Sequence, residues 1–567
     1  MAQGAETFLS ILESGRLGPG SLQPFPSPGR AAEPDLAAEM TALARERIDP
    51  DELDRTGAFP PGLLDTMRDR GYFRLRLPAP AGHGLSDYAA FHAISEVSAW
   101  SPATGQFLAI QNAVGAAALL AALPPGPLHD HVAARVRAGT VSAFAGTEEA
   151  GANNAWPRTT ATPTPDGEHY VLSGTKLYTG SGSFADLLAL TVTIAGAGGD
   201  RRVGVAFVDT DAPGLQVTAQ HEFLGQRGLG NARLRLDGVR VPRDHVLAGE
   251  PGASSFPAAV IPVALLSALY FNAAPALGLA RACLRLVHAF VPGRTVNDRP
   301  LGDYDAVQRI TADLLADVYA MESLTRWCLL GPGASARTLE RVVAKNVCTR
   351  AAWRVADDTV SLLGARGLET AASQARRGAL PVLPAERLLR DARGMRVSGN
   401  VDFILDVNAG RLIMSRFLTD GAAPVEAGPA GDALADDVRR FTATCADLAA
   451  RHPDPADLME RQGTLGALGR IAAELLTAAV VRARATAEHS GGELAALYGA
   501  AARARLAALW TRLDTVTGDA ASGRAAHDHT AHDHTAPDLA APDHVKVSRR
   551  WLDGAADPFT DPGGDRP

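Results

Sequence analysis

Histidines and cysteines are the first residues of this 567-residue chain whose spacing suggests chemistry. A tandem repeat, AHDHTAHDHT, contains His527, His529, His532 and His534. Such a repeat can bind a metal ion, but the low-complexity composition of residues 516–545 favours a solvated linker. The four cysteines are scattered without a CxxC pair. We therefore predict neither a disulfide scaffold nor a zinc site, and we expect a reducing cytoplasm.

A series of glycine-rich and charged segments forms the second group of candidates. In chain order they are FAGTEEAG at 144–151, TTA at 159–161, DGEHYVLSGTKLY at 166–178, GQRG at 225–228, DGVRVP at 237–242, RTVNDRPLGDYDAVQ at 294–308, LGARG at 363–367 and PAERLLRDAR at 384–393. Each segment alone is a weak signal, because glycine-rich turns are common. The information lies in their order, and in the elements that must position them.

The hydrophobic pattern places these segments on three consecutive regions. Residues 36–140 repeat apolar side chains at intervals of three and four, which predicts helices. Residues 141–250 contain β-branched stretches between turns, and the alternation of Arg and Leu at 233–236 predicts a strand with one wet face. Residues 255–418 are helical again. Helices, then strands, then helices indicate an α+β fold with segregated elements.

Three further segments lie outside this core. Residues 1–35 are rich in Gly, Pro and Ser and predict a flexible leader. Residues 432–515 predict helices whose apolar stripe packs on the main body or on another subunit, and we expect this region to make an oligomer or partner contact. Residues 516–567 read as a low-complexity tail.

The composition excludes some classes of protein. With 46% hydrophobic and 21% charged residues, the chain is typical of soluble globular proteins. Its net charge of −8 argues against a nucleic-acid-binding protein, which would carry a basic surface. The N-terminus lacks a basic region followed by an apolar core, so we predict no signal peptide. The most apolar stretch, Phe256 to Leu269, is too short to span a membrane.

Taken in order, the segments resemble the acyl-CoA dehydrogenase family, from about residue 36 to residue 418. The family's middle domain carries TEP-x-AGSD, T-x-A, G-D-x-Y-x-L-x-G-x-K-x-W-I-T and V-x-VP, and its C-terminal domain carries R-x-x-FG-x-P, GG-x-G and RDA. The resemblance implies a helical N-terminal domain, a β-barrel-like middle domain and a C-terminal four-helix bundle. It also implies FAD bound between the middle domain and the bundle, in a homodimer or homotetramer.

The resemblance assigns cofactor contacts to individual residues. Thr147 and Tyr178 would lie at the flavin ring, with Tyr178 in place of the usual tryptophan. Thr179 and Gly180 stand where the family has a threonine or serine, although strand-end capping is an alternative role for both threonines. Arg294 would reach the pyrophosphate of the neighbouring subunit's FAD, because that group needs cationic donors; otherwise it is a surface arginine.

Other flavin contacts of the family are replaced in this sequence. The replacements are Asn297 for a phenylalanine, Asp305 for the glutamine of FQ, Ser361 for a glutamine just before Gly364 of the GG-x-G segment, Val401 for the threonine of EGT and Glu149 for the proline of TEP. Acids at positions 149 and 305 would repel a flavin phosphate. We therefore expect FAD to be held in an altered way, weakly, or not at all.

The base of the family is also missing. Family members remove an α-proton with a glutamate in an EGT motif or on the first long helix of the bundle, and these positions are Gly399 and, within about a residue, Ala268. Loss of a general base costs about 10²- to 10⁴-fold in rate. Asp402 and Asp406, one and two helical turns beyond Gly399, could supply a relocated carboxylate. We favour the alternative that both are solvated helix-surface or interface charges.

Three functions remain open, because a fold does not choose among them. The first, which we favour, is α,β-dehydrogenation of an acyl thioester of CoA or an acyl carrier protein, with electrons passed to a partner. The second is a flavin monooxygenase that uses oxygen and needs no glutamate. The LYTGSG segment at 177–182 slightly favours this function. The third is a non-redox acyl-binding protein or an enzyme of another type, which the replaced contacts favour.

Overall fold

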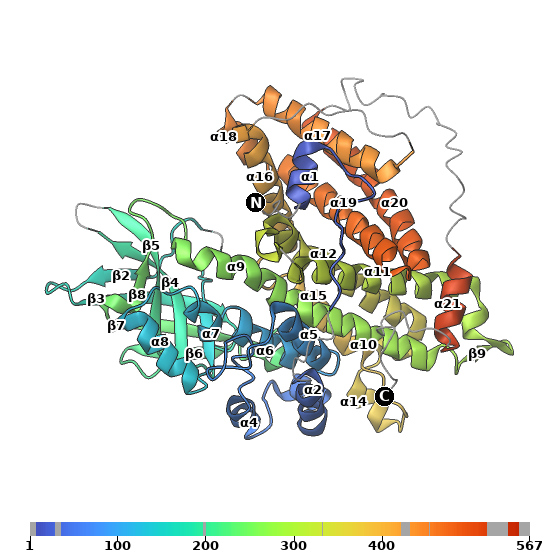
Figure 1. Cartoon of the computed structure of the whole chain (residues 1–567). Coiled ribbons are helices and arrows are strands. Elements are labelled where there is room, and N and C mark those ends of the chain that lie inside the picture. Colours follow the sequence, from blue (N-terminus) through green and yellow to red (C-terminus); the bar gives the residue numbers. More distant parts are fainter. Residues whose placement is uncertain are drawn as a thin grey trace. The chain divides into compact units, whose positions relative to one another are not determined.

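The chain folds into two compact units. The computed structural model describes residues 7–28, 36–152, 154–196, 200–331, 333–420, 431–452, 454–518 and 543–554. The sheet unit comprises residues 32–279 and 370–395, and the bundle unit comprises residues 1–31, 280–369 and 396–567. Helices, then one large sheet, then helices follow one another along the chain, which confirms the predicted α+β fold (Figure 1).

Helices open and close the sheet unit. They are α2 (Leu36–Arg47), α3 (Pro50–Thr56), α4 (Leu63–Asp69), α5 (Asp87–Ser98), α6 (Pro102–Ala113), α7 (Ala116–Leu120), α8 (Pro127–Arg137), α9 (Ile261–Ala268), the first part of α10 (Ala274–Phe290), α14 (Ala371–Arg376) and α15 (Ala385–Met395). Helix α6 is buried over its whole length. It begins at Pro102 because the Ser101 hydroxyl accepts a hydrogen bond from the N–H of Thr104.

An eight-stranded sheet forms the middle of this unit. Its strands are β1 (Ser142–Ala145), β2 (Thr160–Pro163), β3 (His169–Thr179), β4 (Leu187–Ala195), β5 (Arg201–Asp209), β6 (Leu215–Gln220), β7 (Ala232–Pro242) and β8 (Val246–Ala248). The pairing order is β6-β7-β3-β2-β4-β5-β8, and β1 pairs in parallel with β4. Leu187 and Ala189 of β4 pack with α7 and α8, whereas Leu188 and Leu190 face the core on the other side.

Strand β7 has the wet face that its sequence predicts. Leu234 and Leu236 are buried, and Arg233 and Arg235 are exposed. The alternation breaks at Gly238, where φ is +70° and the pairing with β3 shifts by one residue. Glycine takes this conformation without a Cβ clash, so it accommodates the bulge.

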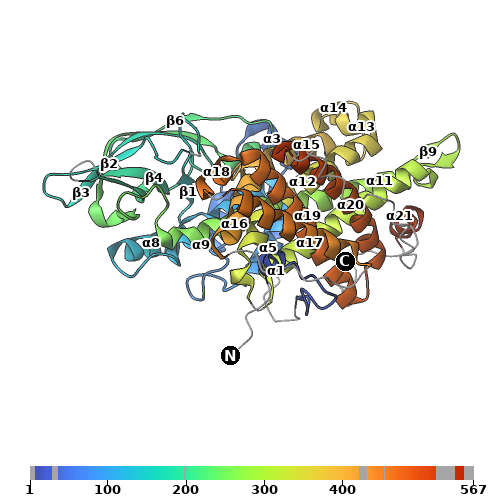
Figure 2. The ribbon, with the colours of Figure 1, turned by 90° about the horizontal axis from the view of Figure 1, so that it is seen from above.

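The bundle unit contains the rest of the helices. They are α1 (Phe8–Ser14), the second part of α10, α11 (Asp305–Leu329), α12 (Thr338–Leu363), α13 (Ala365–Leu368), α16 (Asp402–Asp420), α17 (Ala433–Arg451), α18 (Pro455–Glu460), α19 (Gln462–Glu488), α20 (Gly492–Thr517) and α21 (His544–Leu552). A short hairpin of β9 (Thr295–Val296) and β10 (Arg299–Pro300) joins α10 to α11. From above, α12, α16, α19 and α20 lie as long rods within this unit (Figure 2).

Residues 7–28 are not the flexible leader that their composition predicted. Helix α1 is capped by Thr7, whose hydroxyl accepts a hydrogen bond from the N–H of Ser10, and Phe8 and Leu12 are completely buried. The N–H of Phe8 donates a 2.7 Å hydrogen bond to Glu340 of α12. The prediction was wrong because glycine and proline content conceals a short apolar segment that docks on the bundle.

The helices of 432–515 pack on the bundle of their own chain. Helix α19 lies against α16 and α11. A Cβ on Gly469 would lie 2.0 Å from the carbonyl oxygen of Asp406, so the small residue permits the close approach of α16 and α19. Arg326 of α11 and Glu488 of α19 form a 2.7 Å ion pair. Of the two predicted partners of this region, the main body is the one that the structure shows.

The C-terminal tail is helical over part of its length. Helix α21 occupies His544–Leu552, within the segment 516–567 that was predicted as low complexity. The helix was missed because it is only nine residues long and follows the histidine repeat. The repeat itself lies outside the described residues.

Within the described part of the chain, three helical stretches are long and apolar enough to cross a membrane, judged by length and composition alone. They are Pro102–Leu120, Ala258–Phe290 and Gln462–Glu488. The apolar stretch from Phe256 was predicted to be too short, and this was wrong, because the helix continues through α10 to a total of 33 residues. Most of each apolar window is nevertheless buried inside the protein, at 89%, 62% and 83%. Packing within the folded chain therefore accounts for much of this apolar surface.

Candidate active site

The end of strand β3 presents an exposed aromatic side chain in a strained backbone. Tyr178 is 52% exposed and has a φ of +54°. Its ring lies 5.0 Å from that of His221 and 5.5 Å from that of Phe223. Left-handed backbone at a bulky residue costs free energy and is often found where a ligand is held. The three rings form an aromatic wall, and only Tyr178 was predicted to belong to it.

Three buried polar atoms of the wall and of the turn that follows Tyr178 have no hydrogen-bond partner among the described residues. They are Oγ1 of Thr179, Oγ of Ser183 and Nε2 of His221. The turn that carries the first two is fixed by N–H groups of Ser181 and Ser183, which donate to the carbonyls of Leu229 and Gly230. Buried polar groups are nearly always hydrogen-bonded in folded proteins. Two orphaned atoms on the turn at 178–183 and one on the neighbouring His221 therefore fit a site whose ligand supplies the missing partners.

Gly180 and Thr147 have backbone roles at the same place. A Cβ on Gly180 would lie 3.1 Å from Cδ1 of Ile110, so glycine allows β3 to end close to α6. The carbonyl of Thr147 accepts a 2.8 Å hydrogen bond from the N–H of Leu177. Thr147 therefore contacts the end of β3 through its backbone, as the strand-capping alternative predicted. Its side chain is partly buried and remains available to a ligand.

Glu148 and Lys176 form a buried ion pair behind this turn. The two side chains are 2.7 Å apart, and Lys176 also donates to Thr191 at 3.0 Å. Burial opposes ionisation of Glu148, but hydrogen bonds from Lys176, Thr159 and two backbone N–H groups outweigh it and hold the pKa below its usual range. The pair joins β3, the strand that ends at this turn, to the segment after β1. The rarity of lysine in this chain was the sequence signal that could have pointed to Lys176.

Arg294 stands at the base of the β9–β10 hairpin in the bundle unit. It is exposed, and its side chain has no ion pair or hydrogen bond among the described residues. Asn297 and Asp298 form the turn with φ of +49° and +58°, which suits a two-residue hairpin. An unpaired arginine on a short hairpin fits the predicted pyrophosphate contact.

The remaining predicted cofactor residues of the bundle unit are solvent-facing. Asp305 begins α11 and is 81% exposed, with Arg309 at 3.7 Å. Ser361 is exposed, and its hydroxyl donates to the carbonyl of Asp357 at 3.1 Å. Gly364 ends α12 with a φ of +60°, which favours glycine. Because Asp305 is paired with an arginine only loosely, its charge would still disfavour a phosphate close by.

Asp402 and Asp406 are buried and held by arginines, so they are not solvated helix-surface charges, whereas the alternative of interface charges agrees with their ion pairs to α12. Asp402 lies 2.7 Å from Arg396 and 3.2 Å from Arg350. Asp406 accepts two hydrogen bonds from Arg350, at 2.6 and 3.0 Å, and one from Asn346 at 2.9 Å. Sequence reasoning missed these partners because Arg350 and Asn346 lie on α12, more than fifty residues away.

Neither aspartate is suited to act as a relocated base. Burial opposes ionisation of Asp402, but its hydrogen bond from Arg396 and the charge of Arg350 outweigh burial and lower its pKa. A carboxylate that is paired with two arginines and has a lowered pKa is a weak proton acceptor. Gly399 itself is exposed in a bend with a φ of +61°, and Ala268 is the last residue of α9. We therefore assign Asp402 and Asp406 a structural role.

Lys345 of α12 braces the turn that contains Gly399. Its Nζ donates to the carbonyl oxygens of Arg396 at 3.1 Å and Asn400 at 2.8 Å. The side chain is completely buried, and burial lowers the pKa of Lys345 to about 7 despite the nearby carboxylate of Asp402. This lysine was missed at the sequence level, although it is one of only three in the chain.

Lys345 should make the protein more stable as the pH rises from 7 to 10.5. The folded state favours the neutral amine, whereas the unfolded chain binds a proton up to its ordinary pKa of 10.5. The contribution is complete above pH 10.5 and is lost as the pH falls to 7, at up to about 1.4 kcal/mol per pH unit. In urea unfolding between pH 7 and 9.5, Lys345→Met should lack this slope. Parallel curves for both proteins would show that the lysine keeps its proton.

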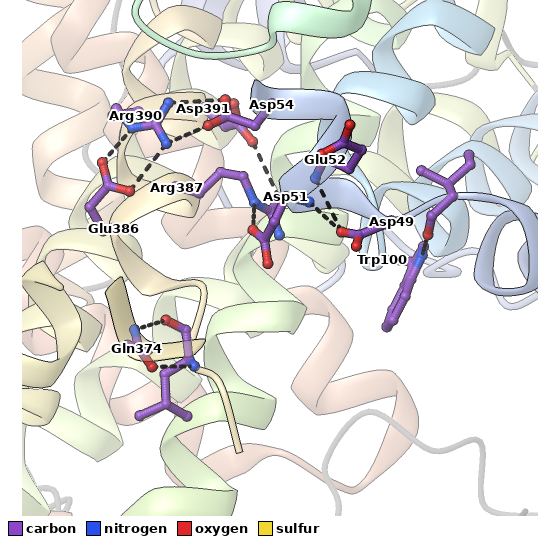
Figure 3. Close-up of polar contacts among 12 residues, drawn as sticks. Asp49, Asp51, Glu52, Asp54, Trp100, Gln374, Glu386, Arg387, Arg390 and Asp391 are labelled. Carbon is purple, nitrogen blue, oxygen red and sulfur yellow. Dashed lines mark hydrogen bonds and ion pairs between the residues drawn. The ribbon is translucent and has the colours of Figure 1, made fainter. Parts of the chain in front are cut away.

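Helix α15, which carries the RDA segment, fixes the loop beside the aromatic wall. Arg390 lies between Asp54 of α3, at 2.7 Å, and Glu386 (Figure 3). The N–H of Gln226 donates to Asp391 at 2.6 Å, and Arg390 donates to the carbonyl of Leu224 at 3.0 Å. Arg390 and Asp391 of this motif therefore position the 221–231 loop.

Models of known protein families match three regions of this chain. The chain matches the family models of the acyl-CoA dehydrogenase N-terminal domain at residues 31–123, the middle domain at 143–239 and the C-terminal domain at 270–400. The middle-domain match contains the turn at 178–183 and most of the sheet. The C-terminal match contains Arg294, Ser361, Gly364 and Gly399.

Individual proteins with similar sequences are named as acyl-CoA or related dehydrogenases. A probable acyl-CoA dehydrogenase of Mycobacterium tuberculosis, FadE10, is 29% identical over 433 residues, which is 75% of this chain and 66% of the relative. Benzylmalonyl-CoA dehydrogenase of Aromatoleum aromaticum is 27% identical over 393 residues, 67% of this chain and 99% of the relative. The chain thus spans just under two thirds of the length of its mycobacterial relatives.

A solved structure shares the fold of nearly the whole chain. The acyl-CoA dehydrogenase of Bacillus anthracis, complexed with FAD, superimposes with a TM-score of 0.73 at 18% identity. The alignment covers 98% of this chain and 99% of that structure. The region beyond residue 418 therefore also has a counterpart in a known fold.

Proposed function

Because the chain belongs to the acyl-CoA dehydrogenase family, we propose that it is an FAD-dependent oxidoreductase of acyl thioesters. The observation that carries this proposal is the group of orphaned atoms of Thr179, Ser183 and His221 beside the exposed ring of Tyr178. The proposed substrate is an acyl group on CoA or an acyl carrier protein, and the proposed reaction is α,β-dehydrogenation. A cytoplasmic homodimer or homotetramer that passes electrons to a partner protein completes the proposal.

The residues of both units fit the cofactor. Tyr178 and its neighbouring rings would flank a flavin ring, and Thr179 and Gly180 would line its edge. Arg294 would bind the pyrophosphate in a neighbouring copy of the chain. Bound FAD would supply a hydride acceptor for the β-carbon of the substrate.

The chain lacks a side-chain base at the family's positions, which shapes the expected chemistry. Gly399 has no side chain, and the two nearby aspartates are engaged by arginines. Without a side-chain base at these positions, we expect slow dehydrogenation. The same absence favours the flavin monooxygenase as the second candidate, because that reaction uses oxygen and needs no carboxylate there.

One series of measurements separates these functions. The purified protein is titrated with FAD, and the loaded protein is mixed without oxygen with straight-chain acyl-CoA thioesters of increasing length. Bleaching of the flavin supports dehydrogenation. No bleaching, together with oxygen uptake that depends on a flavin reductase, supports the monooxygenase. A protein that ignores FAD would leave the non-redox role and overturn the proposal.

Replacing Arg294 by alanine should weaken FAD binding about tenfold or more. A hydrogen bond to a charged group contributes about 1.5–3 kcal/mol, and each 1.4 kcal/mol is a factor of about ten in affinity. Quenching of FAD fluorescence measures the dissociation constant. Arg393→Ala, at an exposed arginine of α15, is the matched control. Equal affinity in both variants would remove Arg294 from the cofactor site.

A further inference from the structure

Helix α21 docks on the bundle unit through one face. Val547, Ser548, Trp551 and Leu552 are buried, and their spacing of three and four residues places them on one side of the helix. Lys546, Arg549 and Arg550 are exposed on the other side. Asp543 caps the helix by accepting a 3.0 Å hydrogen bond from the N–H of Lys546. The segment is therefore a specific part of the fold.

The buried face of α21 meets both ends of the segment that carries the β9–β10 hairpin. The ring of Trp551 lies 5.0 Å from that of His288, in the last turn of α10. A Cβ on Gly302 would lie 3.1 Å from Cδ1 of Leu552, so this leucine covers the chain just after the hairpin. Arg549 lies 3.6 Å from Asp303. Two views of the bundle unit show α21 next to the end of this segment (Figures 1 and 2).

The hairpin has few supports of its own. Its ladder is two residues long on each strand, and its turn is exposed. The backbone of Arg294 is held at the base of the hairpin, because its carbonyl oxygen accepts a 2.7 Å hydrogen bond from the N–H of Leu301. Short two-stranded hairpins are marginally stable alone, so the position of Arg294 depends on what packs against residues 288–303.

We propose that α21 is a brace that positions Arg294 for the cofactor, with Trp551 and Leu552 as its positioning residues. The inference rests on the proposed role of Arg294. It gives the C-terminal segment a function in cofactor binding although none of its own side chains would touch the cofactor. Loss of the brace should increase the mobility of the hairpin and reduce the fraction of chains that hold Arg294 in place.

The test uses the full-length chain and two independent readouts. Trp551→Ala should increase amide hydrogen exchange of residues 291–303 by about tenfold in the protein without FAD. It should weaken FAD binding by about tenfold, as measured by fluorescence titration. Leu552→Ala is the milder second variant should Trp551→Ala fail to fold. Val545→Ala, on the exposed side of the same helix, is the control and should change neither readout.

The outcomes separate the brace from the proposed function. Unchanged exchange at 291–303, while the amides of α21 lose protection, would overturn the brace. Faster exchange with unchanged FAD affinity, in a protein whose affinity does fall with Arg294→Ala, would overturn the coupling to the cofactor. If Arg294→Ala leaves the affinity unchanged, the role of Arg294 and the cofactor part of this inference both fall, and exchange alone still decides whether α21 braces the hairpin.

Discussion

Gly399→Glu should make the flavin bleach about 10²- to 10⁴-fold faster with an acyl-CoA thioester, because a positioned general base contributes a factor of this size. The resemblance to the family aligns position 399 with the glutamate of the EGT motif, and this position lies in an exposed bend. The arginine-bound Asp402 and Asp406 would stay where they are, so the added carboxylate would be the one free acid at this turn among the residues described here. The measurement is anaerobic stopped-flow absorbance of the FAD-loaded protein.

A matched variant separates the base from its structural cost. Gly399 has a φ of +61°, and a residue with a Cβ in this conformation costs about 1–2 kcal/mol. Gly399→Gln carries the same strain and nearly the same volume without a base. A rate for Gly399→Glu no higher than that for Gly399→Gln, at equal FAD occupancy, would contradict dehydrogenation at this turn. That result would favour the flavin monooxygenase as the function of this protein.

Features with a local signature were predictable from the sequence. The alternation of 233–236 gave the wet face of β7, because side chains of a strand point to opposite faces in turn. The order of the motifs led to the family, since several short motifs in register are far more specific than any one. Tyr178 was found in the same way, although its conformation and its neighbours His221 and Phe223 were not.

Features that depend on distant partners were not predictable. The one-turn spacing of Asp402 and Asp406 describes a helix face, but only the fold brings Arg350 from α12 to that face. Helices α1 and α21 are stabilised by burial against the bundle, as the complete burial of Phe8 and the contact of Trp551 with His288 show. Short helices owe their stability to packing more than to propensity, so a sequence window gives little sign of them.

Lys176→Met should destabilise the sheet unit by about 3–5 kcal/mol, because it leaves Glu148 charged and buried without its cation. Lys176 is completely buried, and Glu148 is only 6% exposed. Methionine fills a similar volume, so the loss would come from charge and not from a cavity. Chemical unfolding followed by circular dichroism measures the free energy. Lys546→Met, at an exposed lysine paired with Glu493, should stay within about 0.5 kcal/mol of the parent protein.

The double variant Lys176→Met/Glu148→Gln decides whether the pair itself or the orphaned charge sets this cost. The N–H groups of Arg158 and Thr159 donate to different carboxylate oxygens of Glu148, at 2.5 and 2.9 Å, and glutamine keeps an acceptor oxygen for one of them. Without a buried charge, the double variant should be more stable than Lys176→Met alone. Equal or lower stability would mean that Lys176 acts through its contact with Thr191. The turn at 178–183 follows directly from β3, the strand that carries Lys176. A loss of FAD affinity in Lys176→Met should therefore be reversed in the double variant, together with the loss of stability.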